Sequence, residues 1–171
     1  MKKFLLILLV PLVVSAAAVA APNPASATAH CKNLLRQAPL ASTSLAACVT
    51  AQTTLAAQNA TNAAKTCKAE RAASPTTFAT TYGTAGNGKS NGKAIGACVS
   101  VKENASTVAQ QTAELNAAKQ CKLWRSANAT VFAAAHPTAN GRTFAQFYGT
   151  NTNLKNAFGK CVSTQAKLQH S

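Results

Sequence analysis

The chain contains a ten-residue repeat, because NAAKTCKAER at positions 62–71 recurs as NAAKQCKLWR at positions 116–125. Each copy is followed by a Cys-Val-Ser triplet, which begins at Cys98 in the first case and at Cys161 in the second. A segment that opens on Cys-Lys and closes on Cys-Val-Ser is therefore one module. Repetition at this level favours one supersecondary unit that the chain uses several times.

A shorter first module carries the same signature, from Cys31-Lys32 to Cys48-Val49-Thr50. The chain therefore contains three cysteine-pair modules, and the interval between the two cysteines grows from the first module to the third. The modules differ mainly in the length of the segment that this interval encloses. Their approximate bounds are 31–50, 62–100 and 116–163.

The N-terminus has the pattern of a secretory signal peptide, which we place at residues 1–27. Two lysines precede an apolar run at positions 4–14, and a stretch of small residues follows. We expect cleavage after Ala27, with Ala20 as the alternative position. The apolar run is shorter than the roughly 20 residues of a membrane-spanning helix. We therefore expect a secreted or cell-envelope protein with a single mature domain over residues 28–171.

The composition of that domain predicts an all-α fold. Ala, Gln, Lys and Leu dominate the segments around the cysteines, and strand-like alternation is absent. We expect an up-and-down array or bundle of long alanine-rich helices, stapled by three disulfides. The predicted helices cover about 28–37, 43–73, 93–127, 129–135 and 152–168.

Three local features refine this picture. Ser42 or Ser44 is a candidate N-cap for the helix at 43–73, and Pro75 is expected to lie just after its end. The helix at 93–127 has an apolar stripe at three-, four- and seven-residue steps, formed by Cys98, Val101, Ala105, Val108, Leu115 and Ala118. Most aromatic residues lie in the third module, which should therefore hold the best-packed core: Trp124, Phe132, Phe144, Phe147, Tyr148 and Phe158.

The six cysteines predict a disulfide framework. An even number of cysteines in an exported chain favours disulfides over metal ligands, and the close Cys-x2-Cys spacing of zinc sites is absent, so we expect no metal site. Pairing should be local, because each opening cysteine lies near the end of one helix and each closing cysteine near the start of the next. The staples should then alternate between the two ends of the array. The predicted disulfides are Cys31–Cys48, Cys67–Cys98 and Cys121–Cys161.

The net charge of the chain is +14 at pH 7, from 17 basic and three acidic side chains. Such an excess attracts polyanions. Two basic triplets have i, i+3, i+6 spacing near the ends of the long helices, and two further lysines lie in and beside a glycine-rich segment. The candidate anion-binding residues are Lys65, Lys68, Arg71, Lys119, Lys122, Arg125, Lys89 and Lys93. The alternative is purely structural, because the helix dipole stabilises cations at helix C-termini by about 0.3–1 kcal/mol each.

The repeat resembles one found in uncharacterised secreted bacterial proteins. The resemblance rests on the Ala-Ala-Lys-x-Cys-Lys-x-x-Arg opening, on YGTN at positions 148–151 and on NAFGKCVS at positions 156–163. It covers about 62–163 well and the first module poorly. It implies an exported paired-cysteine helical repeat and no known activity.

Catalytic chemistry is hard to build from this composition. The chain has no Asp, and its acids are Glu70, Glu103 and Glu114; we expect Glu70 to form a surface ion pair with its basic neighbours. Complete disulfide pairing leaves no thiol nucleophile, and no P-loop or dinucleotide fingerprint is present, so we expect no cofactor. The three histidines lie far apart in sequence, and each is expected at the surface or in a turn: His30, His136 and His170.

These observations favour a non-enzymatic binding or structural module of the cell envelope or the extracellular space. Its expected partner is an anionic cell-wall polymer or another polyanion, and no small-molecule substrate is predicted. A membrane-active or toxic secreted protein is the alternative, although alanine-rich helices offer few bulky residues to anchor in a bilayer. An enzyme is the least favoured class.

Overall fold

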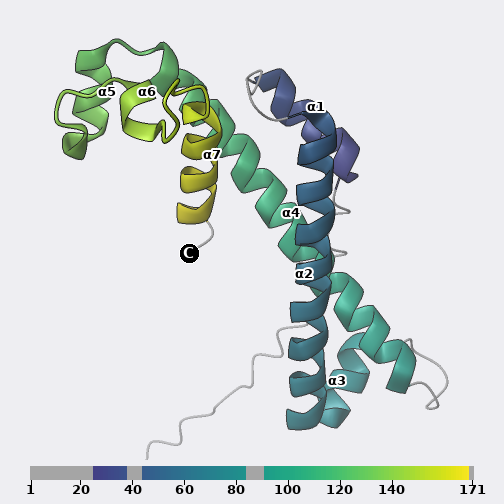
Figure 1. The fold of residues 1–171 in the computed structure, drawn as a ribbon. Helices are drawn as coiled ribbons and strands as arrows, with labels where there is room; N and C mark the ends of the chain where they lie inside the picture. The colour runs from purple at the N-terminus through teal and green to yellow at the C-terminus, as the bar shows by residue number, and fades with distance from the viewer. Residues whose placement is uncertain (1–24, 38–43, 84–90, 170–171) are drawn as a thin grey trace, which may run out of the picture.

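The structure is a computed structural model that describes residues 25–37, 44–83 and 91–169. These ranges are helical with short connections, and they contain no β-strand, which confirms the all-α prediction. The elements, labelled in Figure 1, are α1 (Ala27–Gln37), α2 (Leu45–Ala73), α3 (Pro75–Tyr82), α4 (Asn91–Ser126), α5 (Ala129–Ala135), the 3-10 turn η1 (Pro137–Ala139), α6 (Phe144–Tyr148) and α7 (Ala157–Leu168).

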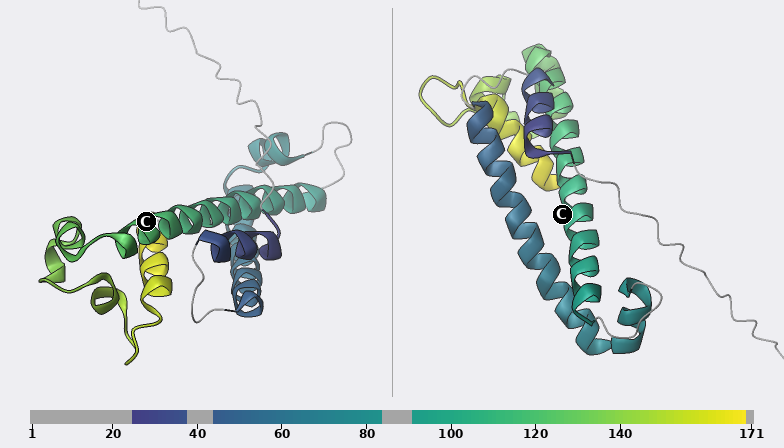
Figure 2. Two further views of the ribbon diagram at one scale, coloured as in Figure 1. Left: turned by 90° about the horizontal axis from the view of Figure 1, so that it is seen from above. Right: turned by 90° about the vertical axis from the view of Figure 1, so that its right-hand side faces the viewer.

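The long helices α2 and α4 form the body of the molecule and cross near their middles (Figure 1). At the crossing, Asn59 of α2 donates hydrogen bonds to Thr107 and Gln110 of α4. Helix α3 packs on both long helices at one end, whereas α1 and α7 pack on α4 at the other (Figure 2). The result is an up-and-down helical bundle in which α4 is the central element.

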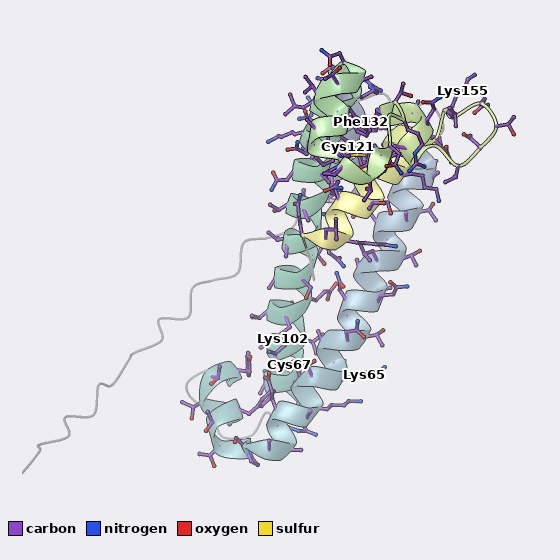
Figure 3. The ribbon with its side chains drawn as sticks, turned by 90° about the vertical axis from the view of Figure 1, so that its left-hand side faces the viewer. Lys65, Cys67, Lys102, Cys121, Phe132 and Lys155 are labelled. Atoms are coloured by element: carbon purple, nitrogen blue, oxygen red, sulfur yellow. A yellow bond between two sulfur atoms is a disulfide. The ribbon has the colours of Figure 1, made fainter. Side chains whose placement is uncertain are left out.

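All three predicted disulfides are present: Cys31–Cys48, Cys67–Cys98 and Cys121–Cys161. The first and third belong to one hydrophobic cluster, and the second belongs to another. Figure 3 shows Cys121 and Cys67 at opposite ends of the molecule. The predicted alternation of the staples between the two ends is therefore confirmed.

The end that holds the first and third staples, which we call the aromatic end, contains the largest core cluster. Its centre is Phe132, which is only 1% exposed and makes edge contacts with Phe144 and Phe147. Trp124 is half-buried against this cluster, and Phe158 is buried within it. The expectation that the third module holds the best-packed part of the fold is confirmed.

The opposite end, which we call the α3 end, has a much smaller core. Its buried residues are Cys67, Phe78, Ala94 and Cys98, and the ring of Tyr82 packs against Phe78 in a tilted arrangement with a centroid distance of 4.9 Å. A cluster of this size buries little apolar surface, so the Cys67–Cys98 disulfide must carry much of the stability at this end.

The break between α2 and α3 was predicted, but α3 itself was not. Ser44 caps α2 by accepting a hydrogen bond from the backbone of Ala47, as expected for one of the two candidate serines, and Ser42 lies outside the described residues. Pro75 was expected only to follow a helix end. It also starts α3, because proline at the first helical position loses no hydrogen bond and already has a helical φ angle.

The last predicted helix, at 152–168, was wrong at its start, because α7 begins at Ala157. The side chain of Asn156 accepts a hydrogen bond from the backbone of Thr150 and donates one to its hydroxyl, which stabilises a turn there. Leu154 within this turn has a φ of 53°, in the left-handed region that ends a helix. Asparagine side chains that bond to nearby backbone compete with helix formation in this way.

Helix α6 was missed because it is only five residues long. The local signal for it was Thr143 followed by Gln146, which form a reciprocal capping box in the structure. Gly149 ends the helix by donating its N–H to the carbonyl of Ala145. A Cβ atom at Gly149 would lie 2.5 Å from that carbonyl oxygen, and a Cβ at Gly83 would meet Ala79 in the same way. Only glycine fits at these two Tyr-Gly steps.

The apolar stripe predicted for α4 is wrong in its middle. Val101 is 45% exposed and Ala105 is exposed, whereas Gln111, Ala113 and Ala117 are buried. The reason is that α2 and α4 meet through hydrogen-bonded polar side chains rather than through a continuous apolar seam. A hydrophobic pattern cannot identify a face of that kind.

Candidate functional site

The first predicted basic triplet lies at the α3 end. Lys65, Lys68 and Arg71 are all exposed on the last turns of α2, around Cys67. Lys93, at the start of α4, is exposed beside the same small core. We call these four residues the α3-end basic cluster. Lys89, the remaining candidate of this region, lies outside the described residues.

The acidic residue within this triplet does not neutralise it. Glu70 was expected to form an ion pair with its basic sequence neighbours, but its carboxylate lies 2.8 Å from the Nζ atom of Lys102 on α4. That hydrogen bond raises the pKa of Lys102 above its ordinary value. Over the described residues, the side chains of the α3-end basic cluster make no ion pair. Their charges are therefore open to solvent and to a ligand.

The second triplet lies at the aromatic end. Lys119, Lys122 and Arg125 are exposed on the last turns of α4, around Cys121. The guanidinium carbon of Arg125 lies 5.1 Å from the centre of the Phe158 ring. This cation–π contact holds one charge of the triplet against the core. We call these three residues the aromatic-end basic cluster.

The structure does not bring the two basic clusters together. They flank Cys67–Cys98 and Cys121–Cys161, which lie at opposite ends of α4. Figure 3 shows Lys65 near one end of the molecule and Cys121 near the other. The helical rise of 1.5 Å per residue places Cys98 and Cys121 about 35 Å apart along α4. The molecule therefore presents two separate cationic ends.

A buried hydrogen-bond network that was not predicted from the sequence joins α1, α2 and α4. His30 is 1% exposed, and its Nε2 atom lies 2.7 Å from Oε2 of Glu114. The side-chain amide of Gln52 donates to the same oxygen at 2.8 Å. The expectation of a surface position for His30 is wrong, because the carboxylate of Glu114 holds its ring inside the bundle.

A second contact extends this network to the N-terminal side of α1. The side-chain amide of Gln111 donates to the carbonyl of Ala25, and its Oε1 atom accepts from the N–H of the same residue, at 2.8 and 3.0 Å. Together with the Asn59 contacts at the crossing, these bonds form a polar seam along α4. The sequence signal for this seam was the presence of glutamine and asparagine at helix positions that face the core, namely Gln52, Asn59 and Gln111.

His136 was expected at the surface or in a turn, and it lies in the turn between α5 and η1, where it is half-buried against the aromatic cluster. Its Nε2 atom lies 3.0 Å from the hydroxyl of Tyr148, and its ring meets Trp124 edge-on at a centroid distance of 4.3 Å. Burial raises the pKa of the Tyr148 hydroxyl above its ordinary value, and a hydrogen bond from Gln165 opposes that shift. This constellation packs the third module.

Two properties of residues 25–37, 44–83 and 91–169 are relevant to function. No group of three or more His, Cys, Asp or Glu side chains within these ranges is placed to hold a metal ion. None of the helices they form combines the length and the apolar character that crossing a membrane requires.

No protein-family model, no curated protein and no solved structure matches this chain.

Proposed function

We propose that this protein is a secreted, non-enzymatic binding or structural module of the cell envelope or extracellular space, and that it binds anionic polymers. Three disulfides are typical of proteins that fold in an oxidising compartment. The signal-like residues 1–27 and the large positive charge point to the same setting.

The observation that carries the proposal is the exposure of both basic clusters without acidic partners among the described residues. The helix dipole accounts in part for the two triplets, since Arg71 and Arg125 lie in the last turns of their helices. It does not account for Lys93, which lies at the start of α4, where the dipole disfavours a cation. Lys93 therefore adds an exposed charge at the α3 end that the helix dipole does not explain, which supports a ligand.

Two of the three acidic side chains, and the two histidines that the structure describes, support a non-enzymatic role, because their contacts are structural. Glu114 and His30 join α1 to α4, and Glu70 joins α2 to α4 through Lys102. His136 packs within the aromatic cluster. Each of these groups is occupied by partners that hold helices together.

The test is retention on immobilised heparin and immobilised polyphosphate in a salt gradient. Replacing Lys65 and Lys68 by Gln, or Lys119 and Lys122 by Gln, should lower the salt concentration at which the protein elutes. The physical reason is that a variant with fewer cationic contacts releases fewer counterions from the polymer when it binds, so its affinity is lower. If the polymer contacts both ends of the protein, each double variant should elute at a lower salt concentration than the wild type.

The matched control removes two charges elsewhere, with Lys32→Gln and Lys155→Gln. Both lysines are exposed and lie outside the two clusters. The proposal requires the control to elute later than either cluster variant. Equal shifts for all three variants would show that only net charge matters, and release of dye from anionic vesicles at micromolar protein would favour the membrane-active alternative.

A further inference from the structure

A groove of about 530 Å³ opens between α2 and α7, and residues of α1 and α4 complete its lining. It exists because α7 packs on α4 and α6, while α1 and α4 are the main neighbours of α2 on this side. Its volume lies within the roughly 300–1,000 Å³ of small-molecule sites. None of the residues of the two basic clusters lines it.

The lining of the groove is mainly apolar. Leu34 of α1, Ala51 and Leu55 of α2, and Val162 and Ala166 of α7 present methyl groups to the same space. An open apolar groove of this size suits an aliphatic chain, because each buried methylene contributes about 0.8 kcal/mol.

Two charged side chains line the groove, and only one is available to a ligand. Glu114 is largely buried, and its Oε2 atom already interacts with His30 and Gln52. Lys167, in the last turn of α7, is exposed and makes no ion pair with any described residue. Charge complementarity therefore favours an anionic head group over a cationic one.

We propose that this groove binds a single-chain amphiphile, with its aliphatic chain along the apolar walls and its anionic head at the ammonium group of Lys167. Along α7, Gly159 and Lys167 are separated by about 12 Å at 1.5 Å per residue, so the groove has an apolar end and a charged end. Binding is non-covalent. It does not depend on the basic clusters, so it stands or falls separately from polyanion binding.

Gly159 provides a variant that closes the groove without disturbing the fold. It lines the groove, and a Cβ atom placed there meets nothing within 4 Å. Gly159→Leu would therefore fill the groove and raise the helix propensity of α7. Gly96→Leu is the matched control, because Gly96 is also helical with open space around its Cβ position, and it lies outside the groove.

The experiment is isothermal titration of the full mature protein with dodecanoate below its micellar concentration. We expect saturable one-to-one binding that Gly159→Leu abolishes and Gly96→Leu retains. Decanoate, which is two methylenes shorter, should bind about tenfold more weakly. Lys167→Gln should weaken dodecanoate binding about fivefold, as expected for one partly exposed ion pair.

Three results would overturn the inference. The first is an absence of saturable binding, and the second is unchanged binding in Gly159→Leu. The third is tighter binding of dodecyltrimethylammonium than of dodecanoate, which would identify Glu114 rather than Lys167 as the selecting charge. Heparin retention should be the same for Gly159→Leu and the wild type, so failure of this inference would be distinct from failure of the polyanion proposal.

Discussion

At the scale of single residues, Glu114 joins three helices through its side chain. It interacts with His30 from α1 and accepts from Gln52 of α2. Glu114→Ala would leave both partners buried without an acceptor, at a cost of about 2–3 kcal/mol in the free energy of unfolding. Urea unfolding monitored by circular dichroism measures this cost.

The matched control for that variant is Glu103→Ala on the same helix. Glu103 is half-exposed and makes none of the ion pairs within the described residues. Its replacement should change the free energy of unfolding by less than about 0.5 kcal/mol. If the two variants were equally stable, the polar network would contribute nothing beyond surface charge.

A second residue-scale prediction concerns alkaline pH. The folded state raises the pKa values of Tyr148, through burial, and of Lys102, through its hydrogen bond with Glu70. Both groups therefore hold their protons more tightly when folded, and their stabilising contribution is complete below the unfolded-state pKa values near 10. The contribution is lost as the pH rises through the folded-state values.

We therefore expect the melting temperature to fall as the pH rises from about 9 to about 11. Tyr148→Phe should make this fall shallower, even though the variant loses the hydrogen bonds of the hydroxyl and starts from a lower stability. Differential scanning calorimetry across this pH range measures the slope. A fall of the same steepness in Tyr148→Phe would assign the whole effect to other groups.

At the scale of elements, the first turn of α1 depends on residues just before it. Ser26 accepts a hydrogen bond from the N–H of Ala29 through its side chain and one from His30 through its carbonyl. Ala25 exchanges two hydrogen bonds with Gln111 of α4. A mature chain that starts after Ala27 lacks all of these contacts, whereas one that starts after Ala20 keeps them.

We therefore predict that the protein beginning at Ala21 is more stable than the protein beginning at Thr28, by about 1–2 kcal/mol for the lost cap and its neighbours. Chemical denaturation of the two purified forms measures the difference. N-terminal sequencing of the exported protein shows which form occurs. Equal stabilities would mean that Ser26 and Ala25 do not order α1.

The elements also show which features the sequence could predict. The long helices and their staples followed from alanine-rich segments and from the repeated cysteine signature, because these signals span many residues. The short helices α3 and α6 did not, because Pro75 was expected only to end a helix and five residues at 144–148 carry too little periodicity. The seven-residue α5 was predicted over its whole length. The polar seam around Asn59 and Glu114 was hidden for a different reason: partners such as His30 come from distant positions, and only the packing of α1 on α4 brings them together.

The candidate site also combines features that the sequence predicts with features that depend on how the helices pack. Exposure of the basic triplets was implied by their charge and by their place near helix ends. The groove could not be predicted, because it depends on how far α7 stands from α2 and on the missing side chain of Gly159. No pattern within one helix encodes the distance between two helices.

At the scale of the whole molecule, the two ends differ in how they are stabilised. The aromatic end has two disulfides and a large core, whereas the α3 end has Cys67–Cys98 and a small one. Replacing Cys67 and Cys98 by Ser should therefore open the α3 end locally. Amide hydrogen exchange should show lost protection in α3 and in the first turns of α4, with protection retained around Phe132.

The corresponding variant at the other end gives the contrast. Replacing Cys121 and Cys161 by Ser removes a staple that closes a longer loop, in the largest core of the molecule. It should lower the global free energy of unfolding by about 3–4 kcal/mol rather than open one end. If both pairs of substitutions reduced protection uniformly, the molecule would unfold as one unit and its ends would not be independent.

The central claim is that two exposed basic clusters, and not net charge alone, bind anionic polymers. The most direct measurement is the salt dependence of heparin binding, as the slope of the logarithm of the binding constant against the logarithm of salt concentration. This slope is negative, and its magnitude should decrease by about one for each cluster lysine replaced by Gln, at Lys65, Lys68, Lys119 or Lys122. It should stay close to the wild-type value for Lys32→Gln combined with Lys155→Gln. A slope that these cluster substitutions leave unchanged, or whose magnitude the control reduces equally, would contradict the claim.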